Sequence, residues 1–338
     1  MNYPQQIAIA ILNWNGVEFL KKFLPSVIKN SDEKISNIYI IDNGSTDNSI
    51  TVLQEHFPTI KIILLDKNYG FAEGYNRGLK KIEAKYYLLL NSDVEVPENW
   101  LKPLYELMES DENIAVCGPK LLDFEKRDTF EYSGAVGGFI DKYAYPFCRG
   151  RIFGNIEKDN QQYDSPLECF WVGGAAFLIR SELYNLLGGF DEIFFAHQEE
   201  IDLCWRLKNL GYKIICEPKS IVYHVGGGTL NKTNPHKTFL NFRNNLFLIY
   251  KNLPKFQRRK VLFARFYLDI IAALQMIFQG HFKDAKAVVK SYFDFWKQKK
   301  NLKYFNRKLN IKYHRGYYKK SIVFLNFIKK VNKFSELT

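Results

Sequence analysis

Three carboxylates fall within four consecutive positions of the stretch HQEEIDLCWR, residues 197–206. They are Glu199, Glu200 and Asp202. A carboxylate placed beside a hydroxyl group can take its proton during nucleophilic attack, which contributes roughly 10² to 10⁴-fold to a rate. Carboxylates in the first turn of a helix also interact favourably with the helix dipole, by about 0.3 to 1 kcal/mol each. The stretch therefore fits two interpretations, a general base or an acidic helix start.

Helical spacing separates these three carboxylates. Glu199 and Asp202 would share one face of a helix, whereas Glu200 is turned about 100° away from Glu199. We expect the shared face to pair with Arg206 or to orient a loop. Glu200 would then point into a cleft.

Another carboxylate, Asp42, ends a predicted strand, and the sequence continues as NGSTDNS. A carboxylate there can accept hydrogen bonds from a nucleobase or from ribose hydroxyls, and Gly44 lets the backbone turn close to a ligand. Asp47 is better explained as a helix cap. Asp42 is therefore predicted to contact a ligand.

Two further residues have the chemistry of metal ligands. Asp93 ends the stretch YYLLLNSD, and a cation that bridges two phosphates needs few protein oxygens because phosphate and water fill its other positions. His224 ends a predicted strand and precedes three glycines. Since a lone histidine is more often a packed or surface residue than a ligand, the residue pattern alone leaves its role open.

These residues must be positioned by a series of strands and helices. Strands are predicted at residues 7–12, 37–42, 60–65, 86–90, 114–118, 176–179, 213–216 and 221–224, and helices at 18–30, 47–57, 71–82, 98–109 and 199–210. Strand and helix alternation favours a mainly parallel, Rossmann-like sheet covered by helices on both faces. Because ligands bind beyond the carboxyl ends of such strands, the polar loops there are expected to form one site.

The motifs together resemble a known family. The stretches ILNWNG, IDNGSTDNS, NYGFAEGYNRGL, LLLNSDVEV, FWVGGAAFLIR, GGFDEIFFAHQEEIDLCWRL and YHVGGGT resemble the motif series of family 2 glycosyltransferases, particularly the bacterial rhamnosyltransferase-like branch. The resemblance implies a glycosyltransferase A fold and an inverting enzyme that uses a nucleotide-sugar donor, dTDP-rhamnose in this branch, and Mg²⁺ or Mn²⁺. The implied acceptor is a glycan or lipid-linked glycan of cell-surface polysaccharide biosynthesis.

The resemblance also implies residue roles. Asp93 matches the last Asp of the family's D-x-D motif and His224 the histidine that completes the metal shell. Glu200 falls at the general base, one methylene longer than the usual Asp, so Glu199 remains the alternative. The implied donor-binding residues are Asn13, Asn15, Asp42, Asn76, Arg77, Asn91 and Ser92, and the implied acceptor-side residues are Gly173, Gly174 and Asp202.

The chain is expected to divide into a nucleotide-sugar-binding catalytic domain, residues 1–235, and a basic, amphipathic helical extension, residues 236–338. Residues 119–170 are predicted to be an acceptor-side insertion. The extension contains 24 Lys or Arg and 4 Asp or Glu, a net charge of +20, whereas the remainder has a net charge of −8. Because its cationic positions alternate with aromatic and apolar ones, we expect it to bind an anionic membrane surface. A solvated bundle or a homodimer interface is the alternative.

The composition also indicates a compartment. The five cysteines are scattered without a metal-like spacing, and the N-terminus lacks the features of a signal peptide. The most apolar stretch, residues 261–278, contains Arg265 and Asp269, which are costly inside a bilayer. We therefore expect a cytoplasmic protein without a membrane span, peripheral at the inner face of the cell membrane.

Two other classes of protein share parts of this pattern. A Rossmann-type dehydrogenase would have the same alternation, but no G-x-G-x-x-G follows the first strand. A nucleic-acid-binding protein would explain the basic extension, but no recognised nucleic-acid motif accompanies the charge. The transferase interpretation is preferred, with no nucleic-acid partner.

Overall fold

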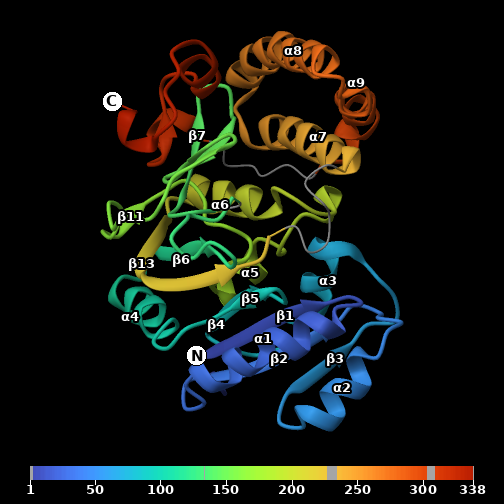
Figure 1. Cartoon of the computed structure of the whole chain (residues 1–338), viewed down its shortest axis with the longest axis vertical. Coiled ribbons are helices and arrows are strands. Elements are labelled where there is room, and N and C mark those ends of the chain that lie inside the picture. The colour runs from blue at the N-terminus through green and yellow to red at the C-terminus, as the bar shows by residue number, and fades with distance from the viewer. Residues whose placement is uncertain (1–2, 133, 227–233, 303–308, 338) are drawn as a thin grey trace.

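The computed structural model describes residues 3–132, 134–226, 234–302 and 309–337. Its centre is a sheet that has nine strands within these ranges, in the order β11-β13-β6-β12-β4-β1-β2-β3, with β5 paired to β13 (Figure 1). The strands are β1 (Ile7–Asn13), β2 (Ser36–Asp42), β3 (Lys61–Leu64), β4 (Tyr86–Asn91), β5 (Val94–Glu95), β6 (Ile114–Asp123), β11 (Leu167–Glu168), β12 (Ala176–Arg180) and β13 (Lys213–His224).

The sheet is parallel in β3-β2-β1-β4 and again between β6 and β13, but β12 runs antiparallel between β4 and β6. The predicted sheet is present, and it is more mixed than strand and helix alternation predicts. The direction of β12 follows from its connection. A strand can run parallel to the strand before it only if the chain first crosses back to the end of the sheet where that strand began. The chain between β6 and β12 supplies no such crossover, so β12 enters the sheet in the reverse direction.

Helices cover both faces of this sheet, as predicted. Alternate residues of β1 point to opposite faces: Ile7, Ile9 and Ile11 join one apolar cluster, and Ala8 and Ala10 join the other. Helices α1 (Val17–Asn30), α2 (Ser49–His56) and α4 (Lys102–Ser110) pack into the first cluster. Helices α3 (Gly70–Leu79), α5 (Ser181–Leu186) and α6 (Glu199–Leu210) pack into the second.

A smaller sheet occupies much of the segment predicted as an insertion. Its order is β10-β9-β8-β7-β14, and its strands are β7 (Gly138–Asp141), β8 (Pro146–Cys148), β9 (Arg151–Ile152), β10 (Asn155–Ile156) and β14 (Tyr317–Tyr318). β14 comes from the C-terminal part of the chain and pairs in parallel with β7. The C-terminal part is therefore not only helical, and it completes a sheet that begins in the insertion.

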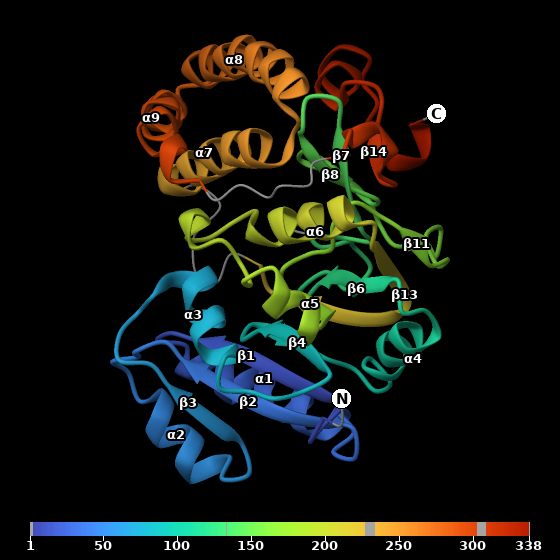
Figure 2. The same ribbon diagram turned by 180° about the vertical axis from the view of Figure 1, so that it is seen from behind.

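The C-terminal helices are α7 (Pro235–Asn252), α8 (Lys255–Phe278) and α9 (Phe282–Gln298). Residues 246–249 of α7 belong to the same core cluster as α6, whereas α8 lies at the far end of the molecule (Figure 2). Short 3-10 segments span Glu192–Phe194, Lys299–Asn301, Ile311–Tyr313 and Phe334–Glu336, and a π-helical turn spans Phe324–Ile328. The boundary at residue 235 remains a prediction, since residues on both sides of it share one core.

Candidate active site

The loops after β1 and β2 meet at the carboxyl edge of the sheet. Asn13 and Asp42 are neighbours in register, and Asn13 Nδ2 donates a hydrogen bond of 3.0 Å to Asp42 Oδ2. Asp42 Oδ1 accepts a bond from the Ser45 amide. Asn15 Oδ1 accepts one of 2.7 Å from the Thr46 amide. The structure thus brings Asn13, Asn15 and Asp42 together into one rigid polar corner.

The loop after β4 lies beside this corner. Leu12 of β1 pairs with Asn91 of β4, and Ser92 Oγ lies 3.8 Å from where a side chain on Gly16 would begin. Asn91 Nδ2 approaches His224 Nε2 at 3.4 Å. Asn91, Ser92 and Asp93 therefore border both the polar corner and the end of β13.

Asp93 and His224 form a close pair. The antiparallel pairing of β5 with β13 sets Val94 opposite His224, and Asp93 Oδ1 lies 3.1 Å from His224 Nε2. Adjacent ligands at about 2.1 Å from one octahedral cation stand about 3 Å apart. The pair therefore fits two positions of one divalent cation. Within the described ranges, no group of three or more His, Cys, Asp or Glu side chains could hold an ion.

Glu131, which the sequence analysis missed, lies on the other side of His224. Its Oε1 is 3.3 Å from His224 Nδ1, and both side chains are buried. Burial alone would lower the pKa of His224, but the interactions with Asp93 and Glu131 outweigh it and raise the pKa to about 10. The only signal in the sequence is a carboxylate within the apolar and Gly-rich stretch FEYSGAVGG.

Glu199 and Glu200 begin α6 as predicted. Glu199 is buried, and desolvation together with the charge of Glu200 raises its pKa well above the usual value. Glu200 is partly exposed. Desolvation raises the pKa of Glu200 to about 7, although backbone amides at the helix start oppose this rise. Glu200 is therefore the carboxylate that can change protonation near neutral pH.

Gly174 connects Glu200 with the loop after β4. A Cβ on Gly174 would lie 3.6 Å from the carboxyl carbon of Glu200, and the next residue, Ala175, accepts a hydrogen bond of 2.9 Å from the Asn91 amide. The Glu200 carboxyl therefore packs beside the Gly174–Ala175 segment, which is hydrogen-bonded to the end of β4. Gly173 packs instead against Gly134, where an added Cβ would lie 2.8 Å from Gly173 Cα.

Asp202 does not lie on an acceptor-facing surface, which corrects the prediction. It is fully buried and binds the cations Arg206 at 2.7 Å and Lys251 at 2.7 Å. Asn252 donates to its other oxygen. Burial would raise the pKa of Asp202, but the charges of Lys251 and Arg206 outweigh it and lower the pKa. The sequence could not indicate Lys251 because it comes from α7, far along the chain.

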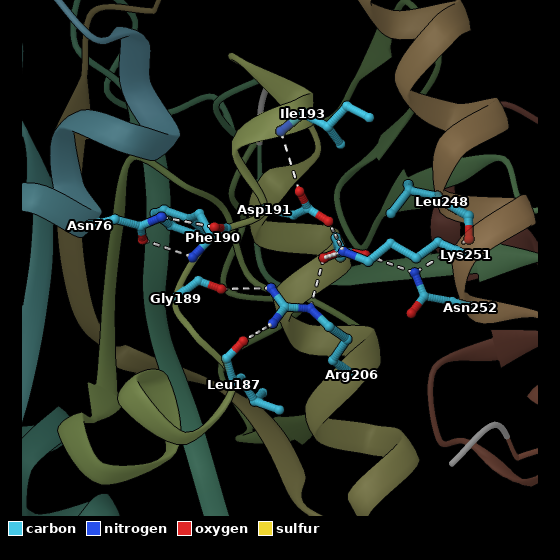
Figure 3. Close-up of polar contacts among 11 residues, drawn as sticks. Asn76, Leu187, Gly189, Phe190, Asp191, Ile193, Arg206, Leu248, Lys251 and Asn252 are labelled. Atoms are coloured by element: carbon cyan, nitrogen blue, oxygen red, sulfur yellow. Dashed lines mark hydrogen bonds and ion pairs between the residues drawn. The ribbon is translucent and has the colours of Figure 1, made fainter. Parts of the chain in front are cut away.

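This buried network also holds the loop that leads into α6 (Figure 3). Arg206 donates to the carbonyls of Leu187 and Gly189 at 3.0 and 2.8 Å. Lys251 binds Asp191 at 2.6 Å. Asp202 and its partners therefore tie the start of α6, which carries Glu199 and Glu200, to α7 and to the loop before it.

Asn76 is a second correction. Its Nδ2 donates to the Phe190 carbonyl, and its Oδ1 accepts from the Tyr184 hydroxyl and the Phe190 amide. The side chain is buried and engaged at both ends, so it supports the loop before α6 (Figure 3) and is not free to bind a donor.

Arg77 lies on the surface of α3. It pairs with Glu73 at 2.6 Å and covers the Tyr69 ring at 3.8 Å. A contact between Arg77 and the donor phosphates stays a prediction. The glycines that follow Gly226 in YHVGGGT lie outside the described residues, as do residues 303–308 of the basic extension.

The fold of this protein is the glycosyltransferase A fold. The fold is similar to that of GalNAc-T7 solved with UDP, GalNAc and Mn²⁺, with a TM-score of 0.59, 17% identity, and coverage of 96% of this chain and 57% of that chain. It is also similar to the mannosyltransferase PcManGT from Pyrobaculum calidifontis in complex with GDP-Man and Mn²⁺, with a TM-score of 0.54, 12% identity, and coverage of 86% and 79%.

Residues 8–184 match the family model Glycosyl transferase family 2, and the chain belongs to that family. Its relatives include an N-acetylglucosaminyl-diphospho-decaprenol L-rhamnosyltransferase of Mycobacterium tuberculosis, 22% identical, with 64% of this chain and 75% of the relative covered. The dTDP-rhamnosyl transferase RfbF of Shigella flexneri is 23% identical, with 75% and 85% covered. The predicted likeness to rhamnosyltransferases of polysaccharide biosynthesis is confirmed, and the dehydrogenase and nucleic-acid alternatives are not favoured.

Proposed function

We propose that this protein is a metal-dependent, inverting hexosyltransferase that moves rhamnose or a related sugar from a nucleotide-sugar donor to a glycan or lipid-linked glycan. The observation that carries the proposal is the close Asp93–His224 pair. It lies beside Asn91 at the end of β4, and β4 is the neighbour of β1 with its Asn13–Asp42 corner. The names of two relatives support the finer points: one is a dTDP-rhamnosyl transferase, and another has an acceptor on diphospho-decaprenol.

On the donor side, Asp42 and Asn13 would bind the nucleoside. They end β2 and β1 in register, and the buried Asn13 Oδ1 has no hydrogen-bond partner among the described residues. Asp93 Oδ1 and His224 Nε2 would hold Mg²⁺ or Mn²⁺, and both metals suit a carboxylate and imidazole pair. A bound cation supplies Lewis-acid stabilisation of the negative charge that builds on the leaving diphosphate.

On the acceptor side, Glu200 takes the proton of the attacking hydroxyl. The hydroxyl oxygen forms a bond to the anomeric carbon while the bond from that carbon to the diphosphate oxygen breaks. The nucleoside diphosphate leaves from the opposite side, which inverts the anomeric centre. This single displacement needs one base and no covalent nucleophile, so Glu199 can remain protonated.

The first test measures donor binding by thermal unfolding. A saturating donor stabilises the folded state by about 2.7 kcal/mol at one hundred times its Kd. We expect dTDP-rhamnose to raise the Tm of the full chain, with a larger shift when Mn²⁺ is present, and Asp93→Asn to lose the metal-dependent part. UDP-GlcNAc, GDP-mannose and NADH serve as comparisons. Stabilisation by NADH alone, or by no nucleotide sugar, would refute the proposal.

Glu131 is expected to govern metal affinity by orienting His224. A carboxylate that accepts from the distal nitrogen of a metal-binding histidine fixes the ring, and its loss typically weakens metal binding by about 10 to 100-fold. Glu131→Ala should therefore weaken Mn²⁺ binding by about that factor in the presence of dTDP, measured by titration with electron paramagnetic resonance. Glu131→Gln should recover part of the affinity, because its amide oxygen still accepts a hydrogen bond.

The matched control for Glu131 is Glu95→Gln. Glu95 follows Asp93 by two positions, but its carboxylate binds Arg127 at 2.8 Å. Its replacement should leave Mn²⁺ affinity unchanged. Equal Mn²⁺ affinity in Glu131→Ala and the wild type would assign Glu131 a packing role only.

The proposal places the reaction in the cytoplasm, at the inner face of the cell membrane. A lipid-linked acceptor would require that location. α8 is long and apolar enough to cross a membrane by length and composition, with a mean hydropathy of 1.8, which is weak evidence for membrane association.

A further inference from the structure

The outer face of α8 is apolar and uncovered. Only 11% of its most apolar 18-residue window is buried. The exposed large side chains recur at helical spacing: Phe256, Phe263, Phe266, Tyr267, Ile270, Ile271, Leu274, Ile277 and Phe278. A contiguous apolar face of this kind marks an interaction site in a soluble protein. α8 lies at the end of the molecule farthest from β2 and β3 in both views (Figures 1 and 2), so a flat partner can reach it.

The charged residues of α8 that face inward explain why the helix lies in this orientation. Arg265 and Asp269 are its buried residues, and they pair with each other at 3.2 Å. Asp269 also accepts from the hydroxyls of Tyr145, before β8, and Tyr292, on α9. Arg265 donates to Asn245 of α7. These polar contacts hold one side of α8 against the rest of the protein.

These polar contacts distinguish two modes of membrane contact. A helix that crossed a bilayer would have to withdraw Arg265 and Asp269 from all their protein partners and carry them into hydrocarbon. A helix that lies in the plane of the interface keeps these contacts and still places its apolar side chains among lipid. The structure favours the interfacial mode.

α9 extends the same surface and adds charge. The exposed apolar residues of α9 are Phe282, Val289, Phe293 and Trp296. α9 packs beside α8, because Tyr292 of α9 contacts Phe266 of α8. Residues 255–300 contain eleven Lys or Arg and three Asp or Glu. Each of the three acidic residues binds another part of the protein. Asp269 pairs with Arg265, Asp284 binds Thr238, and Asp294 binds Arg243 and Gln298. The outward charge is therefore cationic.

We infer that the outer face of α8 and α9, residues 255–298, docks in the plane of an anionic lipid bilayer, with aromatic side chains inserted and lysines at the headgroups. Cationic residues that border an apolar stripe are the features of interfacial helices on acidic lipid. A second copy of the chain is a poorer partner, because a two-fold interface would bring like charges together. This inference concerns a surface outside the active site and does not depend on the proposed reaction.

The test is sedimentation of the full chain with vesicles of phosphatidylcholine alone or with one quarter phosphatidylglycerol. We expect binding to the mixed vesicles, weaker binding by about tenfold or more to phosphatidylcholine, and release at high salt. The double variant Phe263→Ser/Phe278→Ser should reduce binding by about tenfold or more, because both side chains are exposed and replaceable without loss of core packing.

The matched control is Leu186→Ser, an equally exposed apolar residue on α5, which should bind vesicles like the wild type. The double variant should keep the donor-induced rise in Tm, so failure of this inference is distinguishable from failure of the proposed reaction. Equal binding to both vesicles that resists salt would overturn the inference in favour of a spanning helix. Binding to neither, or a stable dimer that the double variant dissociates, would also overturn it.

Discussion

Replacing Glu200 with glutamine is expected to lower kcat by about 10² to 10⁴-fold, the contribution of a positioned general base. The amide keeps the size of the side chain but cannot take a proton from the acceptor hydroxyl. Donor binding should persist, since Asp42, Asp93 and His224 are unchanged. Turnover with saturating donor and acceptor, combined with the donor-induced rise in Tm, separates these two effects.

The control is the adjacent Glu199→Gln. Burial and the charge of Glu200 raise the pKa of Glu199 well above its usual value, so a neutral amide resembles the protonated acid already present. We expect Glu199→Gln to keep most of the turnover. If the two variants behaved in the opposite way, Glu199 would be the base.

The same assignment fixes the pH dependence of the wild type. Burial disfavours the charged form and raises the pKa of Glu200 to about 7. Below that pH the carboxyl group keeps its proton and cannot act as a base. The value of kcat/KM should therefore rise with pH through about 7 and fall about tenfold for each pH unit below it. Glu200→Gln should lose this step, and a step that survived would belong to another group.

Asp202→Asn is expected to destabilise the fold by about 3 to 5 kcal/mol, the usual cost of removing one member of a buried ion-pair network. Asp202 is fully buried between Arg206 and Lys251. Without its charge, Lys251 keeps its bond to Asp191, and Arg206 keeps its bonds to the backbone carbonyls of Leu187 and Gly189. The free energy of unfolding, from urea titration, measures this loss. Turnover should also fall, because the network holds the loop that enters α6.

The control for Asp202 is Glu73→Gln, which removes an ion pair of the same type and spacing at the surface. Glu73 binds Arg77 on α3, where both side chains are partly exposed to water. Pairs of this kind contribute about 0.3 to 0.5 kcal/mol. A loss in Asp202→Asn no larger than in Glu73→Gln would contradict a structural role for the buried network.

Most helices and strands of the fold were predictable, because each depends on the pattern of residues within its own segment. The β-branched runs gave the central strands, and the helical patterns at 18–30 and 199–210 correspond to α1 (Val17–Asn30) and α6 (Glu199–Leu210). The predicted strands at 213–216 and 221–224 form one strand with a register shift between Glu217 and Ile221. The direction of β12 and the return of β14 to β7 were not predictable, since strand pairing depends on contacts across the whole chain.

By itself, the sequence determined the family, the strand and helix order, and the polar residues that end β1, β2 and β4. Local spacing is enough for these because neighbouring residues share an element and a sheet edge. Only the tertiary structure decided that Asp202 is held by Lys251, that Asn76 supports a loop, that Glu131 faces His224, and that α8 turns its apolar side outward. The physical reason is that a polar side chain could form hydrogen bonds or ion pairs with many residues of the chain. Which of these bonds forms depends on the elements that pack against it.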